Sequence, residues 1–300
     1  MKVIALGVHS AFAVGQWEET STGPVYRPRW QSNFLLEFEQ PGKTNENVYR
    51  MVIDFGGDIR HSLAGAGLRM ADIDGWYCSH PHADHIGGVE GIALSTFFHP
   101  AWNTAKAEWL NGDRMADRLF QGDRVPAGCK PDMLGHREVL EELWRAASPG
   151  LSTLQGVKQV TLDTYFNPLP MRTNIDRQFH DGDRTWKYYT IESTHVVSGT
   201  GHMPCYGLML ESSDGRNIYF PTDTLLMMPP TMESFYRKAD VVYQDCETGP
   251  RSGVHSHIED IRQIDPTIKN KCYLYHFNEE PVTDPGEFKG VLQTGEIHHY

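Results

Sequence analysis

The 300-residue sequence lacks any long hydrophobic run, and no segment approaches the roughly 20 apolar residues that span a membrane. Residues 1–7 contain one lysine and a short apolar run, without the longer hydrophobic region and cleavage site of a secretory signal peptide. They fit a first β-strand better. With 39% hydrophobic residues and a mean hydropathy of −0.47, the composition predicts a soluble globular protein with a sizeable core.

Cysteine is scarce, and its five residues are scattered without a Cys-x-x-Cys pair. An odd number at irregular spacing argues against a disulfide framework. It is typical of a protein in a reducing compartment, so we expect a cytoplasmic protein.

Positive charge is also in short supply, with 27 Lys and Arg against 39 Asp and Glu, a net charge of −12. An acidic surface repels a phosphate backbone, which makes large RNA or DNA a poor substrate. The best local candidate for a basic patch, residues 172–187, interleaves Arg and Lys with Asp. A small anionic substrate is compatible with this net charge, because bound metal ions outweigh the surface charge locally.

Histidine, in contrast, is concentrated in one short stretch, residues 79–88, which reads Ser-His-Pro-His-Ala-Asp-His-Ile-Gly-Gly. Imidazole nitrogen and carboxylate oxygen are the ligands that zinc and similar divalent ions prefer. Four such ligands cannot all reach one ion from so short a loop, but with further ligands they can serve two. The candidate ligands here are His80, His82, Asp84 and His85.

The pattern His-x-His-x-Asp-His, after the apolar strand 76–78 and before Gly-Gly, resembles the metallo-β-lactamase superfamily. The resemblance implies an α/β fold, the αββα sandwich, with a two-metal hydrolytic centre at one edge. It also implies that Asp54, in Asp-Phe-Gly, supports the metal loop from a neighbouring strand; the alternative is an ordinary strand-end aspartate before a turn. We expect one domain over 1–300, with an inserted cap or dimer region at roughly 100–185.

Three further segments resemble the remaining ligand motifs of the superfamily, each a strand that ends in a ligand-type residue. The strand 188–194 runs into His195, although His202 in the following loop is an alternative. The strand 217–222 ends at Asp223, with Thr222 in place of the usual glycine. The strand 271–275 ends at His276.

By this resemblance the ligands divide into two sets around a shared carboxylate. Two ions about 3.5–4 Å apart would lower the pKa of a shared water and clamp the attacking and leaving oxygens. Zinc is the expected ion, and manganese suits the same ligands. One ion would be held by His80, His82 and His195 and the other by Asp84, His85 and His276, with Asp223 bridging.

The segments 241–247 and 253–257 resemble the ribonuclease Z-like branch, in which a strand ends in an acidic residue and His-Ser precedes a helix. The match implies that Asp245 orients and charges His255, and that His255 protonates the leaving oxygen. Glu247 and His257 are the alternatives. The catalytic residues are therefore expected to be Asp84, Asp245 and His255.

Within that branch, the tRNA-processing enzymes carry a long arm rich in Gly, Pro and basic residues, which this sequence lacks. The phrases 203–208 and 244–246 are closer to the anti-Pycsar phosphodiesterases of phages and some bacteria. This likeness implies hydrolysis of 3′,5′-cyclic mononucleotides to nucleoside 5′-monophosphates, which would counter a cyclic-nucleotide antiphage signal in the host cytoplasm. A tRNA 3′-endonuclease or another ester hydrolase is the alternative.

The likeness also implies a homodimer in which a loop of one protomer completes the pocket of the other, with residues 100–135 as the candidate loop. A base could stack on Phe12, Trp102, Phe277 or Tyr300. The remaining pattern predicts strands over 33–38, 49–56, 157–162 and 185–193, and helices over 59–68, 89–98, 103–110 and 136–147.

Overall fold

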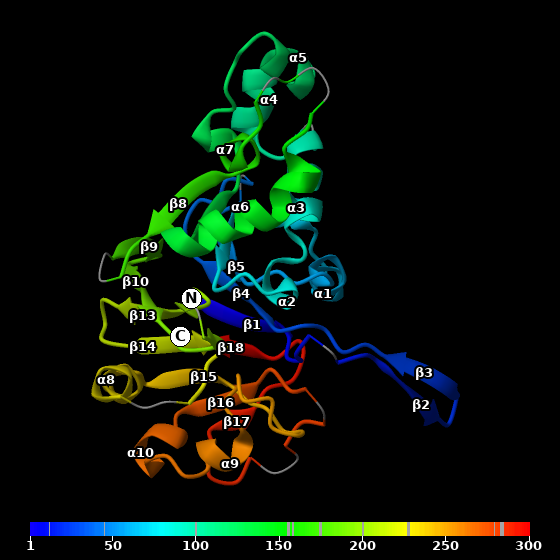
Figure 1. Ribbon diagram of the computed structural model, residues 1–300. Helices are drawn as coiled ribbons and strands as arrows, with labels where there is room; N and C mark the ends of the chain where they lie inside the picture. The colour runs from blue at the N-terminus through cyan, green and yellow to red at the C-terminus, as the bar shows by residue number, and fades with distance from the viewer. Residues whose placement is uncertain are drawn as a thin grey trace.

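Two seven-stranded sheets packed face to face form the centre of the computed structural model (Figure 1). The structure describes residues 1–11, 13–44, 46–99, 101–154, 157, 159–173, 176–199, 201–226, 229–278, 280–282 and 285–300. Both sheets are antiparallel on one side and parallel on the other.

The first sheet contains the N-terminal strands and has its parallel half at β5 to β8. In spatial order its strands are β18 (Ile297–His299), β1 (Lys2–Gly7), β4 (Asn33–Phe38), β5 (Tyr49–Ile53), β6 (Gly75–Cys78), β7 (Asp132–His136) and β8 (Asn167–Met171).

The second sheet is built from the C-terminal half of the chain, with its parallel half at β14 to β17. Its strands, in spatial order, are β17 (Gly290–Val291), β16 (Cys272–Tyr275), β15 (Val241–Asp245), β14 (Asn217–Thr222), β13 (Tyr206–Ser212), β10 (Arg184–Glu192) and β9 (Arg177–Asp181).

Helices cover the outer face of each sheet, as the labels of Figure 1 show. The helices on the side of the first sheet are α1 (Ile59–Gly65), α2 (Ala83–Ile86), α3 (Val89–Phe98), α4 (Thr104–Leu110), α5 (Met115–Phe120), α6 (Arg137–Leu151) and α7 (Leu162–Tyr165), with short 3₁₀ turns at Met70–Asp72 and Ala127–Cys129. Of these, α4 and α5 lie beyond α3 and α7, away from the sheet (Figure 1). Those on the second sheet are α8 (Pro230–Lys238), α9 (Ile258–Ile261) and α10 (Pro266–Lys269).

Alternation of side chains along the strands explains these four layers. In β4, Leu35 faces the helices of the first sheet, whereas Phe34 and Leu36 face the second sheet. In β13, Leu208 lies between the sheets and Met209 packs under α8. Successive strand residues point to opposite faces, so strands buried on both faces give three stacked apolar layers and the expected αββα sandwich.

Most of the predicted elements are present, some with shifted ends. The strand predicted over 49–56 ends at Ile53, which frees Asp54 for the turn beyond it. The helix predicted over 59–68 ends at Gly65. The helix predicted over 136–147 runs to Leu151, through Pro149.

The strand predicted over 157–162 is wrong. The residues described there are not in a strand, and Leu162 begins the helix α7. Thr161 and Thr164 form a capping box at its start, and the Thr161 amide donates to Thr164 Oγ1 at 3.1 Å. Val160 packs under the helices, so local capping and burial decide the structure instead of β-propensity.

The strand β8 was not predicted, because Pro168 and Pro170 interrupt its sequence. Proline cannot donate to a neighbouring strand, but it is tolerated at the edge of a sheet. β8 is the edge strand after β7, which explains the exception.

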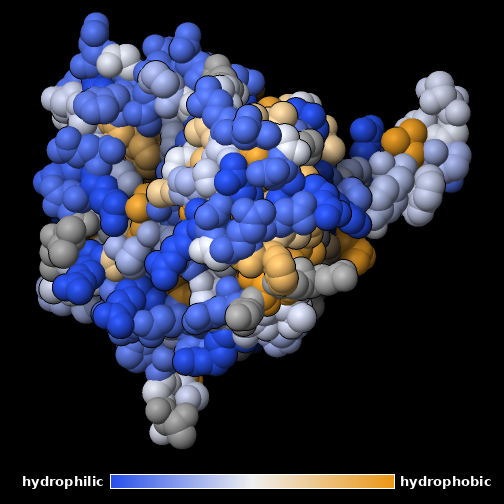
Figure 2. All heavy atoms as spheres, turned by 90° about the horizontal axis from the view of Figure 1, so that it is seen from above, coloured by the Kyte–Doolittle hydropathy of each residue, from blue (hydrophilic) through white to orange (hydrophobic). Residues whose placement is uncertain are grey.

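A hairpin of β2 (Gln16–Thr20) and β3 (Gly23–Arg27) projects from the body, which Figures 1 and 2 show from two directions. Trp17 and Tyr26 pair on it, with ring centroids 5.5 Å apart, and Trp17 is 71% exposed. The second small hairpin joins β11 (Val197–Ser198) to β12 (Gly201–His202). None of the described helices has both the length and the apolar character needed to cross a membrane.

Candidate metal centre

Loops at one edge of the sandwich bring the candidate residues together. They follow β5, β6, β10, β14, β15 and β16, so both sheets contribute. Where strands are parallel, their carboxyl ends meet at the same edge, which is where open α/β sheets place their sites. Three groups of possible metal ligands result among the described residues, and Asp223 belongs to each of them. Two groups have four members, and the third adds Asp245 and His255 to Asp223.

The first group consists of His80, His82, His195 and Asp223, whose ligand-type atoms lie within 4.8 Å of one another. His82 Nδ1 is 3.1 Å from His80 Nε2 and 3.1 Å from His195 Nε2. Asp223 Oδ2 lies 3.7 Å from both of these Nε2 atoms. Three imidazole nitrogens and one carboxylate oxygen therefore point at a common centre.

The second group consists of Asp84, His85, Asp223 and His276 and meets the same 4.8 Å criterion. His85 Nε2 is 3.4 Å from Asp84 Oδ2 and 3.1 Å from Asp223 Oδ2. His276 Nε2 is 3.5 Å from Asp84 Oδ2 and 3.3 Å from Asp223 Oδ1. The two oxygens of Asp223 thus face in two directions, as a bridging carboxylate requires.

The unsatisfied atoms and the charges of the centre both fit a cation. Asp223 Oδ1 and His276 Nε2 are buried and have no hydrogen-bond partner, which is rare for polar atoms in a protein interior. The carboxylates of Asp54, Asp84 and Asp223 are all buried around His85. Buried negative charge is costly unless it is paired or coordinates a metal, so this donor set suits divalent ions.

The histidines differ in charge because their neighbours differ. Burial lowers the pKa of His80 well below its usual value, and burial also lowers that of His195 to about 4, so both rings are neutral, as imidazoles that bind a metal must be. Burial opposes the charged form of His85 too, but Asp223, Asp84 and Asp54 outweigh it and raise its pKa. The three carboxylates around His85 therefore favour a positive charge at this position, which a bound divalent cation could supply instead of the protonated ring.

Asp54 orients two of the candidate ligands. His85 Nδ1 donates to Asp54 Oδ2 at 2.8 Å, which leaves His85 Nε2 directed at the centre. The Ser79 amide and hydroxyl donate to the same carboxylate at 2.9 and 2.8 Å, and Ser79 Oγ lies 2.9 Å from His80 Nδ1. Such outer contacts select the ring tautomer and raise the basicity of the ligand.

Gly56 explains the rest of the Asp-Phe-Gly motif. A Cβ atom at this position would lie 2.3 Å from the Asp84 carbonyl oxygen, so only glycine lets the metal loop approach. Both ends of the motif thus support the loop 79–88, Asp54 through its hydrogen bonds and Gly56 through the close approach that it permits.

The backbone is strained around the centre. Four described non-glycine residues have a positive φ, and three of them are Asp54 at 59°, Thr222 at 60° and His276 at 65°. This left-handed region costs a non-glycine residue roughly 1–3 kcal/mol and persists where the surroundings enforce it. The positive φ explains why the superfamily usually has glycine at this position, and it makes Thr222 a strained exception.

The positions of His195 and His202 show which of them lies near the other candidate ligands. His195 is 1% exposed, and its Nδ1 donates to the Val254 carbonyl at 2.7 Å. His202 lies on the small β12 strand, where its exposed ring is 3.3 Å from Glu192. The structure therefore brings His195, and not His202, to the other candidate ligands; their role as ligands stays a prediction.

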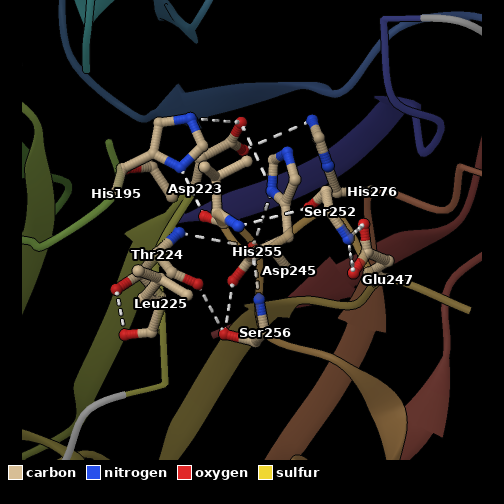
Figure 3. A network of polar contacts seen from close by, with 12 residues as sticks. His195, Asp223, Thr224, Leu225, Asp245, Glu247, Ser252, His255, Ser256 and His276 are labelled. Carbon is tan, nitrogen blue, oxygen red and sulfur yellow. Dashed lines mark hydrogen bonds and ion pairs between the residues drawn. The ribbon is translucent and has the colours of Figure 1, made fainter. Parts of the chain in front are cut away.

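The pair Asp245 and His255 lies directly beside Asp223, as Figure 3 shows. His255 Nδ1 is 3.3 Å from Asp245 Oδ2 and 3.8 Å from Asp223 Oδ2. Burial lowers the pKa of His255, but Asp223 and Asp245 outweigh it and raise the value to about 9. The ring is therefore protonated at neutral pH, with its Nε2 proton directed away from both carboxylates.

Glu247 and His257, the alternatives to this pair, have structural partners. The carboxylate of Glu247 accepts the Ser252 amide at 3.0 and 2.9 Å and holds the loop that carries His255 (Figure 3). His257 lies 3.1 Å from the Gly249 carbonyl through Nε2, and its Nδ1 accepts the Glu259 amide at the start of α9. Both shape the loop and neither lies in the candidate ligand groups.

Three of the four aromatic residues proposed to stack a base are not available for it. Trp102 and Phe277 are at most 3% exposed. The Tyr300 amide donates to the Met1 carbonyl, at the opposite end of β1 from the centre, and its hydroxyl contacts Tyr243 at 2.8 Å. Phe12 lies outside the described residues.

Sequence reasoning missed several residues that hold the site. These are Ser79 on the metal loop, the Val254 carbonyl behind His195, and the buried Gln244 and Ser256 around Asp245. Each of the four adjoins a candidate site residue in the sequence, since Ser79 precedes His80, Gln244 precedes Asp245, and Val254 and Ser256 flank His255. The residue type of Val254 gives no indication of its role, because any residue supplies a carbonyl.

Comparison with known families agrees with this geometry. The model of the family described as anti-Pycsar protein Apyc1 matches residues 1–123 and 115–297. The chain belongs to this family. The anti-Pycsar protein Apyc1 of Bacillus phage vB_BveM-Goe7 is 26% identical over 293 residues, which cover 92% of this chain and 95% of the relative.

Solved structures place this anti-Pycsar family member in the metallo-β-lactamase fold. A diphosphatase of the PhnP family superposes with a TM-score of 0.63 at 14% identity and covers 100% of this chain and 97% of its own. Human tRNase Z, short form, superposes with a TM-score of 0.58 at 13% identity over 100% and 99% of the two chains. At such low identities the likeness establishes the fold alone.

We expect Asp54→Asn to lower the affinity of this family member for zinc or manganese by about 10- to 100-fold, because a neutral amide no longer polarises His85 and Ser79. Isothermal titration of the metal-free protein measures this. The matched control is Asp74→Asn, which changes a fully buried carboxylate that accepts the Arg50 amide away from the centre. Unchanged affinity in Asp54→Asn would contradict the supporting role.

Proposed function

We propose that this chain is a dinuclear metal-dependent phosphodiesterase that opens 3′,5′-cyclic mononucleotides to nucleoside 5′-monophosphates. The observation that carries the proposal is the shared carboxylate: Asp223 belongs to both four-membered candidate ligand groups and also faces His255. A phosphoryl group held over Asp223 would lie next to both ligand groups and next to an acid.

The residues that would hold one ion are His80, His82 and His195, and those for the other are Asp84, His85 and His276, with Asp223 between them. Zinc is the expected ion and manganese the alternative. When bound, such ions neutralise the phosphate charge and lower the pKa of an attacking water. The chain buries Asp223 together with His80, His85, His195 and His276, while His82 and His255 are partly exposed to solvent.

His255 would serve as the general acid. Attack by water forms a new P–O bond and breaks the bond between phosphorus and O3′, and the departing alkoxide needs a proton. Because Nδ1 faces Asp245, the Nε2 proton of His255 is the one free to move to O3′. Asp245 then stabilises the proton on Nδ1, as a carboxylate does for a catalytic imidazole.

Several observations support a small substrate. The family description is anti-Pycsar, and the cyclic-nucleotide signal of an antiphage defence is the substrate that our sequence analysis expects. The β2–β3 hairpin, which projects from the body, carries Glu18 and Glu19 beside Arg27 and is not basic. All five cysteines are buried and unpaired, which suits a reducing cytoplasm, including that of a phage-infected host.

The tRNA 3′-endonuclease function remains the second candidate, because human tRNase Z shares the fold. Its substrate is a polyanion, and the net charge of −12 opposes such binding. Another ester hydrolase would have no need for the acid at His255.

We expect the zinc-loaded protein to convert at least one 3′,5′-cyclic mononucleotide to its 5′-monophosphate, measured by chromatography across a panel of bases. Asp223→Asn should reduce the rate by at least about 100-fold, because both ligand sets lose their common carboxylate. Cleavage of a precursor tRNA with all cyclic nucleotides intact would overturn the proposed substrate. If the protein hydrolyses neither the cyclic nucleotides nor the precursor tRNA, phosphodiester hydrolysis is excluded as its function.

The acid role predicts a dependence on the leaving group. We expect His255→Ala to lower kcat for a cyclic nucleotide by about 10²–10⁴-fold, while bis(p-nitrophenyl) phosphate, whose leaving group needs no proton, loses much less. His257→Ala is the matched control, since it removes a neighbouring imidazole with no place at the centre. An equal loss on both substrates would exclude general-acid catalysis by His255.

We also propose the homodimer that the family likeness implies, with part of 100–135 at the interface. In that segment Phe120 is 73% exposed, so its apolar ring is accessible to a second protomer. Light scattering should give about twice 34.0 kDa for the wild type, and Phe120→Asp should shift the mass toward the monomer. Trp17→Asp, equally exposed on the hairpin, is the comparison; a wild-type monomer would refute the dimer.

A further inference from the structure

A buried amide lies behind the candidate acid, on the side of Asp245 away from His255. Gln244 is the last-but-one residue of β15 and is fully buried. Its Nε2 donates to Asp245 Oδ1 at 2.7 Å, while Asp245 Oδ2 faces His255 Nδ1. Ser256 Oγ also lies 3.2 Å from Oδ1, and the Thr224 and Ser256 amides donate to Oδ2 at 3.3 and 3.5 Å. The bond from Gln244 is the shortest of these contacts, and it is made to the oxygen that does not face His255.

The orientation of this amide is set by a tyrosine from a helix. Tyr236 of α8 is buried, and its hydroxyl donates to Gln244 Oε1 at 2.6 Å. A carboxylate accepts hydrogen bonds only, so Gln244 must present its nitrogen to Asp245. The flipped amide would lose the hydrogen bond to Asp245 and place an oxygen against the carboxylate, so the orientation in which Tyr236 donates to Oε1 is the favourable one.

The same amide reaches the neighbours of Asp223. Gln244 Nε2 is 3.1 Å from Ser256 Oγ, and Ser256 Oγ donates to the Thr224 carbonyl at 2.7 Å. Thr224 follows Asp223 directly, and Ser256 follows His255, as Figure 3 shows. One amide therefore connects the turn after Asp223, the carboxylate of Asp245 and the segment of His255.

We propose that Gln244 is a positioning residue for the acid: fixed by Tyr236, it holds the Asp245 carboxylate so that Oδ2 meets His255 Nδ1. The inference rests on the proposed function, since it assumes that His255 protonates a leaving oxygen. Loss of the amide contact lets the carboxylate rotate, and a misaligned imidazole transfers its proton less well. Neither Gln244 nor Tyr236 touches the reacting atoms.

The test compares two substrates and two tyrosines. Tyr236→Phe removes one hydroxyl without changing the packing, and Tyr165→Phe is its match, because Tyr165 is equally buried and donates to the Leu151 carbonyl under the other sheet. We expect Tyr236→Phe to lower kcat for the cyclic nucleotide by about tenfold with KM unchanged. Bis(p-nitrophenyl) phosphate should stay within about twofold, and Tyr165→Phe should leave the ratio of the two rates unchanged.

A second readout does not depend on activity. The proton on His255 Nδ1 can be followed by nitrogen-15 NMR, with His255→Ala used to assign it. We expect Tyr236→Phe to shift or broaden this resonance and Tyr165→Phe to leave it in place. Gln244→Met, which removes the amide at similar volume, should produce the larger change in both readouts and serves if Tyr236→Phe does not fold.

Two results would overturn the inference: an unchanged resonance and rate ratio in both network variants, or an equal loss on both substrates. A wild-type protein that hydrolyses bis(p-nitrophenyl) phosphate but no cyclic nucleotide would contradict the proposed substrate instead. In that case the resonance in Tyr236→Phe still decides whether Gln244 positions Asp245 against His255.

Discussion

The arrangement of the candidate ligands depends on one buried group, the carboxylate of Asp223. Four imidazoles and the acid His255 face its two oxygens, and its backbone follows a residue in left-handed conformation. Placing this charge next to Asp84 and Asp54, out of water, is costly without a compensating cation. The local strain and the two unsatisfied polar atoms are the structural signs of that cost, and a divalent ion would relieve it.

The sandwich is what makes such a concentration of charge possible. Candidate ligands come from loops after β6 in the first sheet and after β10, β14 and β16 in the second, so neither sheet alone supplies a complete set. The apolar layer between the sheets, which includes Phe34, Phe220 and Tyr243, fixes the distance between these loops. Packing in the core thereby sets atomic distances at the edge.

Hydrogen bonds behind the ligands decide which atoms face the centre. Asp54 accepts from His85 Nδ1, the Val254 carbonyl accepts from His195 Nδ1, and Gln244 fixes the far side of Asp245. These contacts leave His85 Nε2 and His195 Nε2 facing the candidate centre and Asp245 Oδ2 facing His255. The loop of His255, the proposed acid, is joined to the candidate ligand His195 through the Val254 carbonyl, so one hydrogen bond ties the positions of the two histidines together.

The sequence predicted the αββα sandwich through the family resemblance that the His-x-His-x-Asp-His loop carries. It also named the members of the candidate ligand groups and the pair Asp245 and His255, because strand-end motifs are local. It did not predict the β2–β3 hairpin or the proline-containing β8, and it misassigned 157–162, where capping by Thr161 prevails. Only the tertiary structure separated His195 from His202 and placed Gln244 behind Asp245. Those outcomes depend on which loops meet across two sheets, and residues far apart in sequence carry no local mark of their contact.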